Sequence, residues 1–100
     1  MYIIKPKGGS GSMVIKKTIK LKDGLHSRPA MMISKLAREY NGDLRIISKN
    51  GNPLNINCVS IISIILGQCL YNDIIEFETN SEDVMNKLNE LFDSNWFQKQ

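Results

Sequence analysis

Apolar residues recur along the chain with two different periods, and each period indicates one kind of element. Residues 14–21 and 73–79 alternate between apolar and polar side chains, which is typical of half-buried strands. In residues 27–40 and 81–92 the apolar residues recur every three to four positions, which predicts helices with one buried face. The pattern therefore predicts two strands, each followed by a helix.

The first predicted helix carries signals at both ends. Ser27 precedes Pro29, and we expect the Ser27 oxygen to cap the helix while Pro29 occupies the first turn. Asn41-Gly42 is expected to end the helix. Ser81 is expected to cap the second helix, where Glu82 and Asp83 place negative charge at its N-terminus. One apolar face is expected on the first helix, made of Ile33, Leu36, Ala37 and Tyr40.

Between the two helices, residues 43–48 and 54–57 read as a hairpin. Asn50-Gly51 separates them, and both residues tolerate the positive φ angles that a tight turn requires. Pro53 lacks the amide that a central strand would donate, so the second of these strands is expected at a sheet edge.

The segment Val59–Leu66 leaves two structures open. Its β-branched residues favour a strand. As a helix, it would place Ile61 and Ile64 on one face and Ile62, Ile65 and Leu66 on the other, and periodicity does not decide between the two. The complete order is strand, helix, strand, strand, undecided, strand, helix, which predicts an α+β sandwich with helices on one face of an antiparallel sheet.

One hundred residues suffice for one small domain. We interpret residues 1–12 as an added tag or linker, because GGSGS has the composition of a flexible linker and Met13 follows it; the alternative is a native flexible leader. Residues 13–100 then form the domain. The start of the chain resembles no signal peptide, and the apolar run 59–70 is too short and interrupted to cross a bilayer, so we expect a cytoplasmic protein without membrane insertion.

Charge is distributed unevenly along the chain. The formal net charge is +3, but residues 13–50 hold nine bases and three acids, whereas residues 51–100 hold two bases and seven acids. The central strands carry no exposed aromatic residues for base stacking, so we expect no nucleic-acid partner.

Cys58 and Cys69 have neither a CxxC spacing nor companion metal ligands, so we expect no metal site. They are either two free thiols or one disulfide, and a cytosolic location favours free thiols.

His26, the only histidine, is the candidate reactive residue. It lies between a glycine-containing break and the predicted start of a helix, and Arg28 follows two residues later. Free amides and the helix dipole attract anions there, a guanidinium can bind two oxygens, and a neutral imidazole is a nucleophile. These residues predict an anion site with a nucleophile in it.

The segment Gly24–Ala30, with the sequence GLHSRPA, resembles the active-site signature of the HPr phosphocarrier family. The order of elements, the Asn50-Gly51 turn and the Leu66-Gly67 pair occur where that family has them, so the resemblance extends over residues 13–93. It implies a βαββαβα open-faced sandwich, a four-stranded antiparallel sheet with three helices on one face. Val59–Leu66 would then be a short helix.

The resemblance also implies a function. His26 would accept a phosphoryl group on Nδ1 from phospho-Enzyme I and pass it to EIIA components of sugar transport, as a stoichiometric carrier and not a turnover enzyme. Arg28 and the helix amides near Ser27 would bind the phosphoryl oxygens, with no cofactor or metal. Ile61 and Ile64 would form an apolar docking surface for these partners, and we expect a monomer. The alternative is an HPr-like regulatory module that binds a transcription factor or a metabolic enzyme.

The chain departs from the family pattern at the start of the short helix. Many members have a regulatory serine there, but gap-free counts from either side reach Cys58 or Val59. Ser60 is the adjacent alternative, and one residue is in excess between Cys58 and Gly67.

Overall fold

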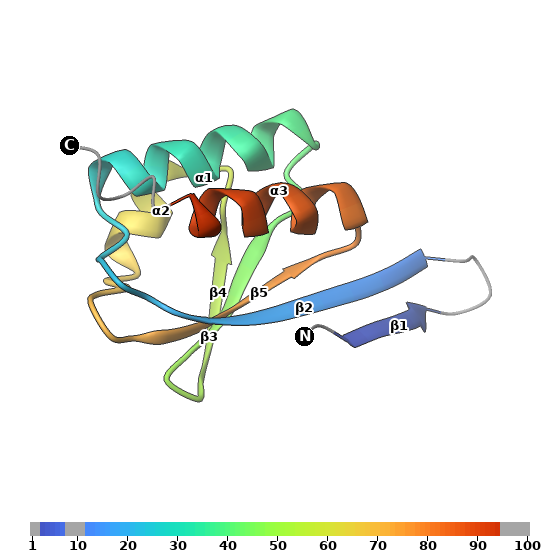
Figure 1. Cartoon of the computed structure of the whole chain (residues 1–100), viewed down its shortest axis with the longest axis horizontal. Helices are drawn as coiled ribbons and strands as arrows, with labels where there is room; N and C mark the ends of the chain where they lie inside the picture. The colour runs from blue at the N-terminus through green and yellow to red at the C-terminus, as the bar shows by residue number, and fades with distance from the viewer. Residues whose placement is uncertain (1–2, 8–11, 95–100) are drawn as a thin grey trace.

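Alternating strand residues give this protein a sheet with one buried face, and three helices cover that face (Figure 1). The structure is a computed structural model and describes residues 3–7 and 12–94. Its elements are β1 (Ile3–Lys7), β2 (Ser12–Lys20), α1 (Ser27–Glu39), β3 (Arg45–Lys49), β4 (Asn52–Asn57), α2 (Ile61–Leu66), β5 (Ile74–Thr79) and α3 (Glu82–Asp93).

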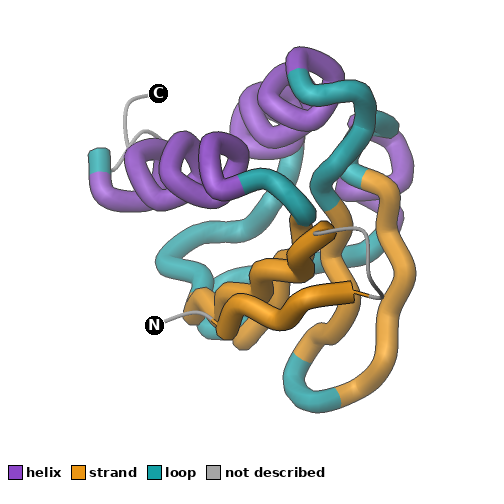
Figure 2. The backbone as a smooth tube through the Cα atoms, turned by 90° about the vertical axis from the view of Figure 1, so that its right-hand side faces the viewer, coloured by secondary structure: helices purple, strands orange, loops and turns teal. Residues whose placement is uncertain are grey.

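The strands pair in the order β1-β2-β5-β3-β4, and every pairing is antiparallel. From β2 to β4 this is the predicted four-stranded sheet, and β4 lies at the edge, as Pro53 indicates. In Figure 2 the helices gather on one side of the strands. The predicted βαββαβα open-faced sandwich is therefore confirmed.

A fifth strand extends this sheet beyond the prediction. β1 pairs with β2 from Ile3 opposite Lys16 to Lys7 opposite Ser12. It lies in the segment that the sequence pattern set aside as a leader, because the linker-like GGSGS follows it, and a strand can join a sheet edge through backbone hydrogen bonds. The division into a leader over 1–12 and a domain over 13–100 stays a prediction.

The core lies between the sheet and the helices. β5 supplies Ile75 and Phe77, and the Phe77 ring packs against Phe92 of α3 with ring centroids 6.0 Å apart and planes tilted by 57°. Around them are the fully buried side chains of the other strands and helices, which include Ile15, Ile33, Leu44, Ile46, Val84, Met85 and Leu88.

The predicted turns and stops form where expected. Asn50 and Gly51 join β3 to β4 with φ angles of 53° and 83°. Asn41 and Gly42 follow α1 with φ angles of 59° and 79°, and the Gly42 amide donates to Ala37 O over 2.7 Å. At α3, the Ser81 oxygen accepts a 3.3 Å hydrogen bond from the Val84 amide, as a helix cap does.

The undecided segment is a helix, which agrees with the family expectation. Ser60 caps α2, since its oxygen accepts a 3.1 Å hydrogen bond from the Ser63 amide. Ile64 packs into the core with no exposed surface. The cap and this one buried contact outweigh the strand propensity of the isoleucines.

None of the helices in the described part of the chain has the length and apolar character needed to span a bilayer.

Candidate functional site

The loop that carries His26 is held by the segment that follows α2. Leu25 N donates to Cys69 O over 2.8 Å, Leu21 N donates to Asp73 O over 2.9 Å, and Asn72 N donates to Leu21 O over 2.9 Å. Leu21 and Leu25 are buried between these bonds. The backbone of the loop is therefore fixed on both sides of the turn, while the His26 side chain is 61% exposed.

The start of α1 differs by one residue from the prediction. His26, not Ser27, is the N-cap, because Ala30 N donates to His26 O over 2.9 Å in the first helical bond. Ser27 is the first helical residue, and Pro29 lies in the first turn without an amide to donate. The prediction that Ser27 caps the helix was wrong because Ser27 already has helical backbone, so another residue occupies the cap position.

With His26 as the N-cap, the first amides of α1 are open to an anion. The His26 side chain makes no capping hydrogen bond, so it leaves the amides of Ser27 and Arg28 at the positive end of the helix dipole without a side-chain cap. The imidazole comes directly before those amides. A negatively charged group bound to the ring would lie beside the helix N-terminus.

Arg28 is exposed in the first turn, and it forms no ion pair or side-chain hydrogen bond with the residues that the structure describes. Its guanidinium is available to bind an anion next to His26. His26, Ser27 and Arg28 are thus together at the same helix end, as the sequence predicts.

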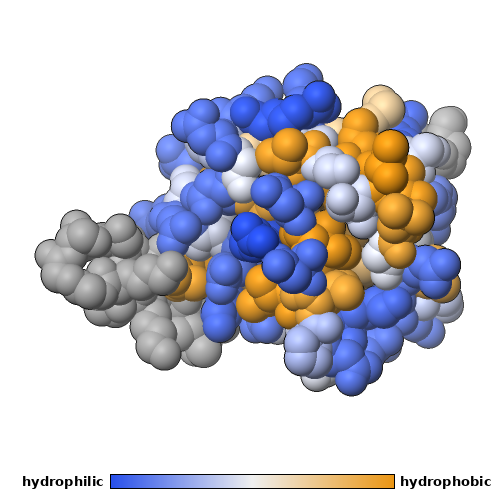
Figure 3. Space-filling model, turned by 180° about the vertical axis from the view of Figure 1, so that it is seen from behind, coloured by the Kyte–Doolittle hydropathy of each residue, from blue (hydrophilic) through white to orange (hydrophobic). Residues whose placement is uncertain are grey.

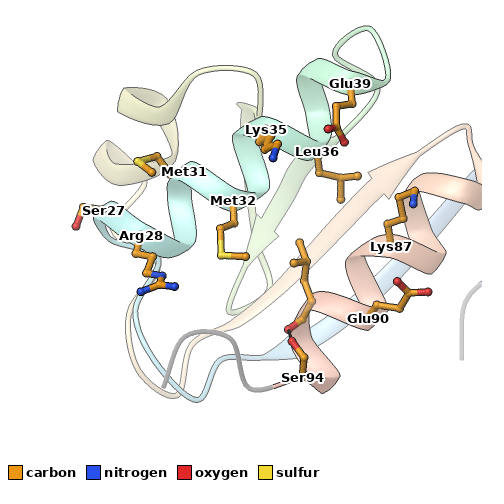
Figure 4. Close-up of a pocket in the computed structure, with 11 residues that line it drawn as sticks. Ser27, Arg28, Met31, Met32, Lys35, Leu36, Glu39, Lys87, Glu90 and Ser94 are labelled. Atoms are coloured by element: carbon orange, nitrogen blue, oxygen red, sulfur yellow. Dashed lines mark hydrogen bonds between the residues drawn. The ribbon is translucent and has the colours of Figure 1, made fainter. Parts of the chain in front are cut away.

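A groove of about 1010 Å³ runs between α1 and α3 and begins at this helix end (Figure 4). Met31, Met32 and Leu91 line its apolar part. Beyond Arg28, the groove is lined by two lysines and two glutamates, Lys35, Lys87, Glu39 and Glu90. Because the two glutamates offset the charge of the two lysines, the groove itself has no strong attraction for a phosphate group. The exposed end of α1 stays the candidate anion site.

Asp23 lies within ion-pair distance of the imidazole, and the sequence pattern did not single it out. Its Oδ1 lies 3.7 Å from Nε2 of His26 and accepts a 2.8 Å hydrogen bond from the Gly24 amide. The signal was present in the sequence as an acid three residues before the histidine.

The expected exposure of the pair Ile61 and Ile64 is wrong. Ile64 is fully buried, and Ile61 is half-buried against the core, so the two do not form an exposed surface together. The opposite face of α2 is exposed: Ile62 is 69% and Leu66 is 74% exposed. A two-faced apolar helix does not show in its sequence which face meets the core, and in the fold α2 packs against both α1 and β4.

The exposed apolar surface continues beyond α2. We call the group of Ile62, Ile65, Leu66, Leu70 and Tyr71 the α2 patch, and all five are exposed. Figure 3 shows apolar side chains gathered on the side of the molecule where α2 lies. The segment that carries Leu70 and Tyr71 is the one that binds the His26 loop, so the α2 patch and His26 have a fixed relation to each other.

Both cysteines are buried and free, in agreement with the prediction. The pKa of the Cys58 thiol is raised to about 12, chiefly by burial and then by nearby Cys69, while Arg45 opposes the shift. Burial also raises the pKa of Cys69, and Lys49 opposes that shift. Neither thiol is a nucleophile near neutral pH. Among the described residues, no three His, Cys, Asp or Glu side chains form a group that could hold a metal ion.

Two comparisons with known proteins find matches to this chain. The family model described as the PTS HPr component phosphorylation site matches residues 15–94. The crystal structure of HPr-C-His from Thermoanaerobacter tengcongensis superposes with a TM-score of 0.68 at 23% sequence identity, and the match covers 79% of this chain and 91% of that one. The comparison with curated proteins finds no match.

Proposed function

Because the chain belongs to the PTS HPr family, a family of phosphocarriers, we propose that His26 accepts a phosphoryl group from phospho-Enzyme I and passes it to EIIA components of sugar transport. The observation that carries this proposal is the exposed His26 at a helix N-terminus without a side-chain cap, with Arg28 exposed in the first turn of the same helix. The protein is then a carrier that is used stoichiometrically. The proposed activity takes place in the cytoplasm.

The transfer needs a nucleophile and a place for negative charge. The Nδ1 lone pair of His26 forms a bond to phosphorus while the donor's N–P bond breaks and its electron pair returns to the donor ring. The charge on the transferring group is spread over its oxygens, so stabilisation by positioned donors dominates such reactions. The amides of Ser27 and Arg28 and the Arg28 guanidinium are the donors at this site.

The fixed loop supports this chemistry through positioning. Leu25 and Leu21 are anchored by backbone bonds to Cys69 and Asp73, so the ring approaches its partner on a preformed support. The α1 helix end does not have to form when the phosphoryl group arrives.

We assign partner docking to the α2 patch in place of the pair Ile61 and Ile64. An exposed apolar group of this kind beside a reactive residue is typical of a protein-binding surface. Its fixed relation to His26 allows one partner to contact both at once.

Two purified partners test the proposal. With phosphoenolpyruvate and catalytic Enzyme I, the wild-type chain is expected to gain one acid-labile phosphoryl group and to lose it when EIIA is added. The His26→Ala variant is expected to gain none.

The regulatory alternative gives another result. A pure binding module would bind its partner through the α2 patch with no phosphorylation of the wild type, and His26→Ala would leave that binding unchanged.

A further inference from the structure

A carboxylate lies beside the imidazole of His26, and the transfer described above gives it no role. Asp23 Oδ1 is 3.7 Å from Nε2, and the same oxygen accepts the Gly24 amide hydrogen bond of 2.8 Å. We propose that Asp23 is a positioning residue for phosphoryl transfer, which holds the ring proton on Nε2 of His26 both before and after the transfer. This inference rests on the proposed phosphocarrier function.

The orientation of the ring is the first argument. Gly24 is buried, and a Cβ atom there would lie 3.0 Å from Cδ2 and 3.6 Å from Nε2 of His26. The Cδ2–Nε2 edge of the ring therefore faces the turn made by Asp23 and Gly24. Nδ1 lies on the other edge of an imidazole. The structure thus separates the nitrogen near the carboxylate from the nitrogen that takes the phosphoryl group.

The backbone fixes the carboxylate as well as the ring. The Gly24 amide binds Asp23 Oδ1, and the next amide, that of Leu25, is bound to Cys69 O. A carboxylate in this position is held by a short local bond and not only by its attraction to the ring. Such an outer partner orients an imidazole and determines which nitrogen carries the proton.

The proton position has consequences for both directions of transfer. The 3.7 Å separation of Asp23 Oδ1 and Nε2 is an electrostatic contact and not a hydrogen bond. The negative charge of the carboxylate favours the N–H of the neutral ring on the nearer nitrogen, Nε2, which keeps the lone pair on Nδ1. When Nδ1 bonds to phosphorus and the donor's N–P bond breaks, the proton stays on Nε2 and the ring becomes positively charged. Asp23 offsets that charge, and the protonated ring is the better leaving group for the next transfer.

Other charges at the loop oppose or assist this effect. The phosphoryl group itself is negative and is repelled by Asp23, but it is attached to the edge of the ring that faces away from the carboxylate. Lys22 precedes Asp23, and Arg28 lies in the first turn of α1. Cys69, on the segment packed against the loop, is a buried thiol whose pKa is raised by burial, so it contributes no charge near neutral pH. Asp23 is 41% exposed, which limits its effect to a few-fold.

The variant Asp23→Asn tests the proposal, because an amide oxygen can still accept the Gly24 hydrogen bond while the charge is lost. Glu39→Gln, an exposed carboxylate at the far end of α1, is the matched control. Nitrogen-15 NMR of the unphosphorylated proteins is expected to show more Nδ1–H tautomer in Asp23→Asn than in the wild type and the control.

A second readout uses the phosphorylated proteins. The midpoint of the hydrolysis rate against pH is expected to move to lower pH in Asp23→Asn, with hydrolysis about two- to fivefold slower on the alkaline side of the wild-type midpoint. An unchanged tautomer ratio together with an unchanged profile overturns the role of Asp23. A wild type that Enzyme I does not phosphorylate overturns the phosphocarrier function instead, and the NMR comparison still decides the role of Asp23.

Discussion

The amide of Leu25 donates a 2.8 Å hydrogen bond to the carbonyl oxygen of Cys69, and this bond joins the loop before α1 to the segment after α2. These two segments are more than forty positions apart in the sequence. One carries His26 at its end, and the other continues the exposed apolar surface of α2 through Leu70 and Tyr71. The proposed reactive histidine and the proposed docking surface therefore lie on two segments that backbone hydrogen bonds hold together.

Arg28 is expected to stabilise the transferring phosphoryl group. Because a hydrogen bond to a charged group contributes about 1.5–3 kcal/mol, Arg28→Ala should slow phosphoryl acceptance from phospho-Enzyme I by roughly 10- to 100-fold. Lys35→Ala is the control, an exposed cation on the same helix. Rapid-quench measurement of the phosphorylated fraction checks this. Equal rates for the two variants would remove Arg28 from the site.

The two faces of α2 predict opposite effects of substitution. Ile64→Ala should lower the free energy of unfolding by about 2–5 kcal/mol, because it leaves a cavity in the core. Ile62→Ser and Leu66→Ser should change it by less than about 0.5 kcal/mol, because both side chains are exposed.

Urea unfolding measures these changes, and calorimetry measures binding to Enzyme I. The serine variants are expected to bind Enzyme I more weakly than the wild type does. Wild-type affinity in both of them would contradict docking through the α2 patch.

Asp73 is expected to stabilise the fold in a pH-dependent way. The Leu70 amide and the Asn50 side-chain amide donate hydrogen bonds of 2.8 and 2.9 Å to its carboxylate, and these bonds, that of Leu70 first, lower the pKa of Asp73. A lowered pKa in the folded state gives stability that is present above the ordinary carboxyl value of 3.8 and is lost as the pH falls through the folded value.

The wild type should therefore be more stable than Asp73→Asn near neutral pH. The difference in stability should shrink as the pH falls below the ordinary carboxyl value of 3.8. Urea unfolding of both proteins along a pH series measures it. A constant difference across the series would show that the charge of Asp73 makes no contribution.

The buried thiols predict a slow reaction with alkylating reagents. Burial raises the pKa of Cys58 to about 12, so the thiolate is scarce in the folded protein. With iodoacetamide near neutral pH, we expect no modification of Cys58 in the native protein and full modification in a denaturant, as intact mass shows. Rapid native modification would contradict its burial.

The same shift makes the fold sensitive to alkali. A pKa raised in the folded state gives stability that is present below the unfolded value, about 9.0, and is lost as the pH rises toward the folded value of about 12. Cys58→Ala is expected to lose less stability than the wild type over this interval. Parallel losses in the two proteins would show that the thiol is not responsible.

Most of the fold follows from local patterns, and the failures have physical causes. Asn50-Gly51, Ser81 and the alternation around Phe77 predict structures that depend on neighbouring residues, and all three are present. Which face of α2 is buried depends on its packing against α1 and β4, and these contacts leave no mark in the local sequence period. Strand β1 joins through backbone bonds that any composition can make.

At the site, sequence reasoning brought His26 and Arg28 to one helix end, where the structure places them. It put the cap one residue too late, because both His26 and Ser27 precede Pro29 closely enough to begin the helix. It also passed over Asp23 and Cys69. The role of Asp23 depends on how the turn folds back on the ring, and the contribution of Cys69 is a backbone carbonyl, which its residue type does not predict.

Intact-mass measurement after incubation with phosphoenolpyruvate and Enzyme I tests the phosphocarrier function most directly. The wild-type chain is expected to gain the mass of one phosphoryl group and to lose it in acid, as a phosphohistidine does, and His26→Ala is expected to keep its original mass. An unchanged wild-type mass with an active, matched Enzyme I, or an equal gain in His26→Ala, would contradict the assignment of His26 as the phosphoryl carrier.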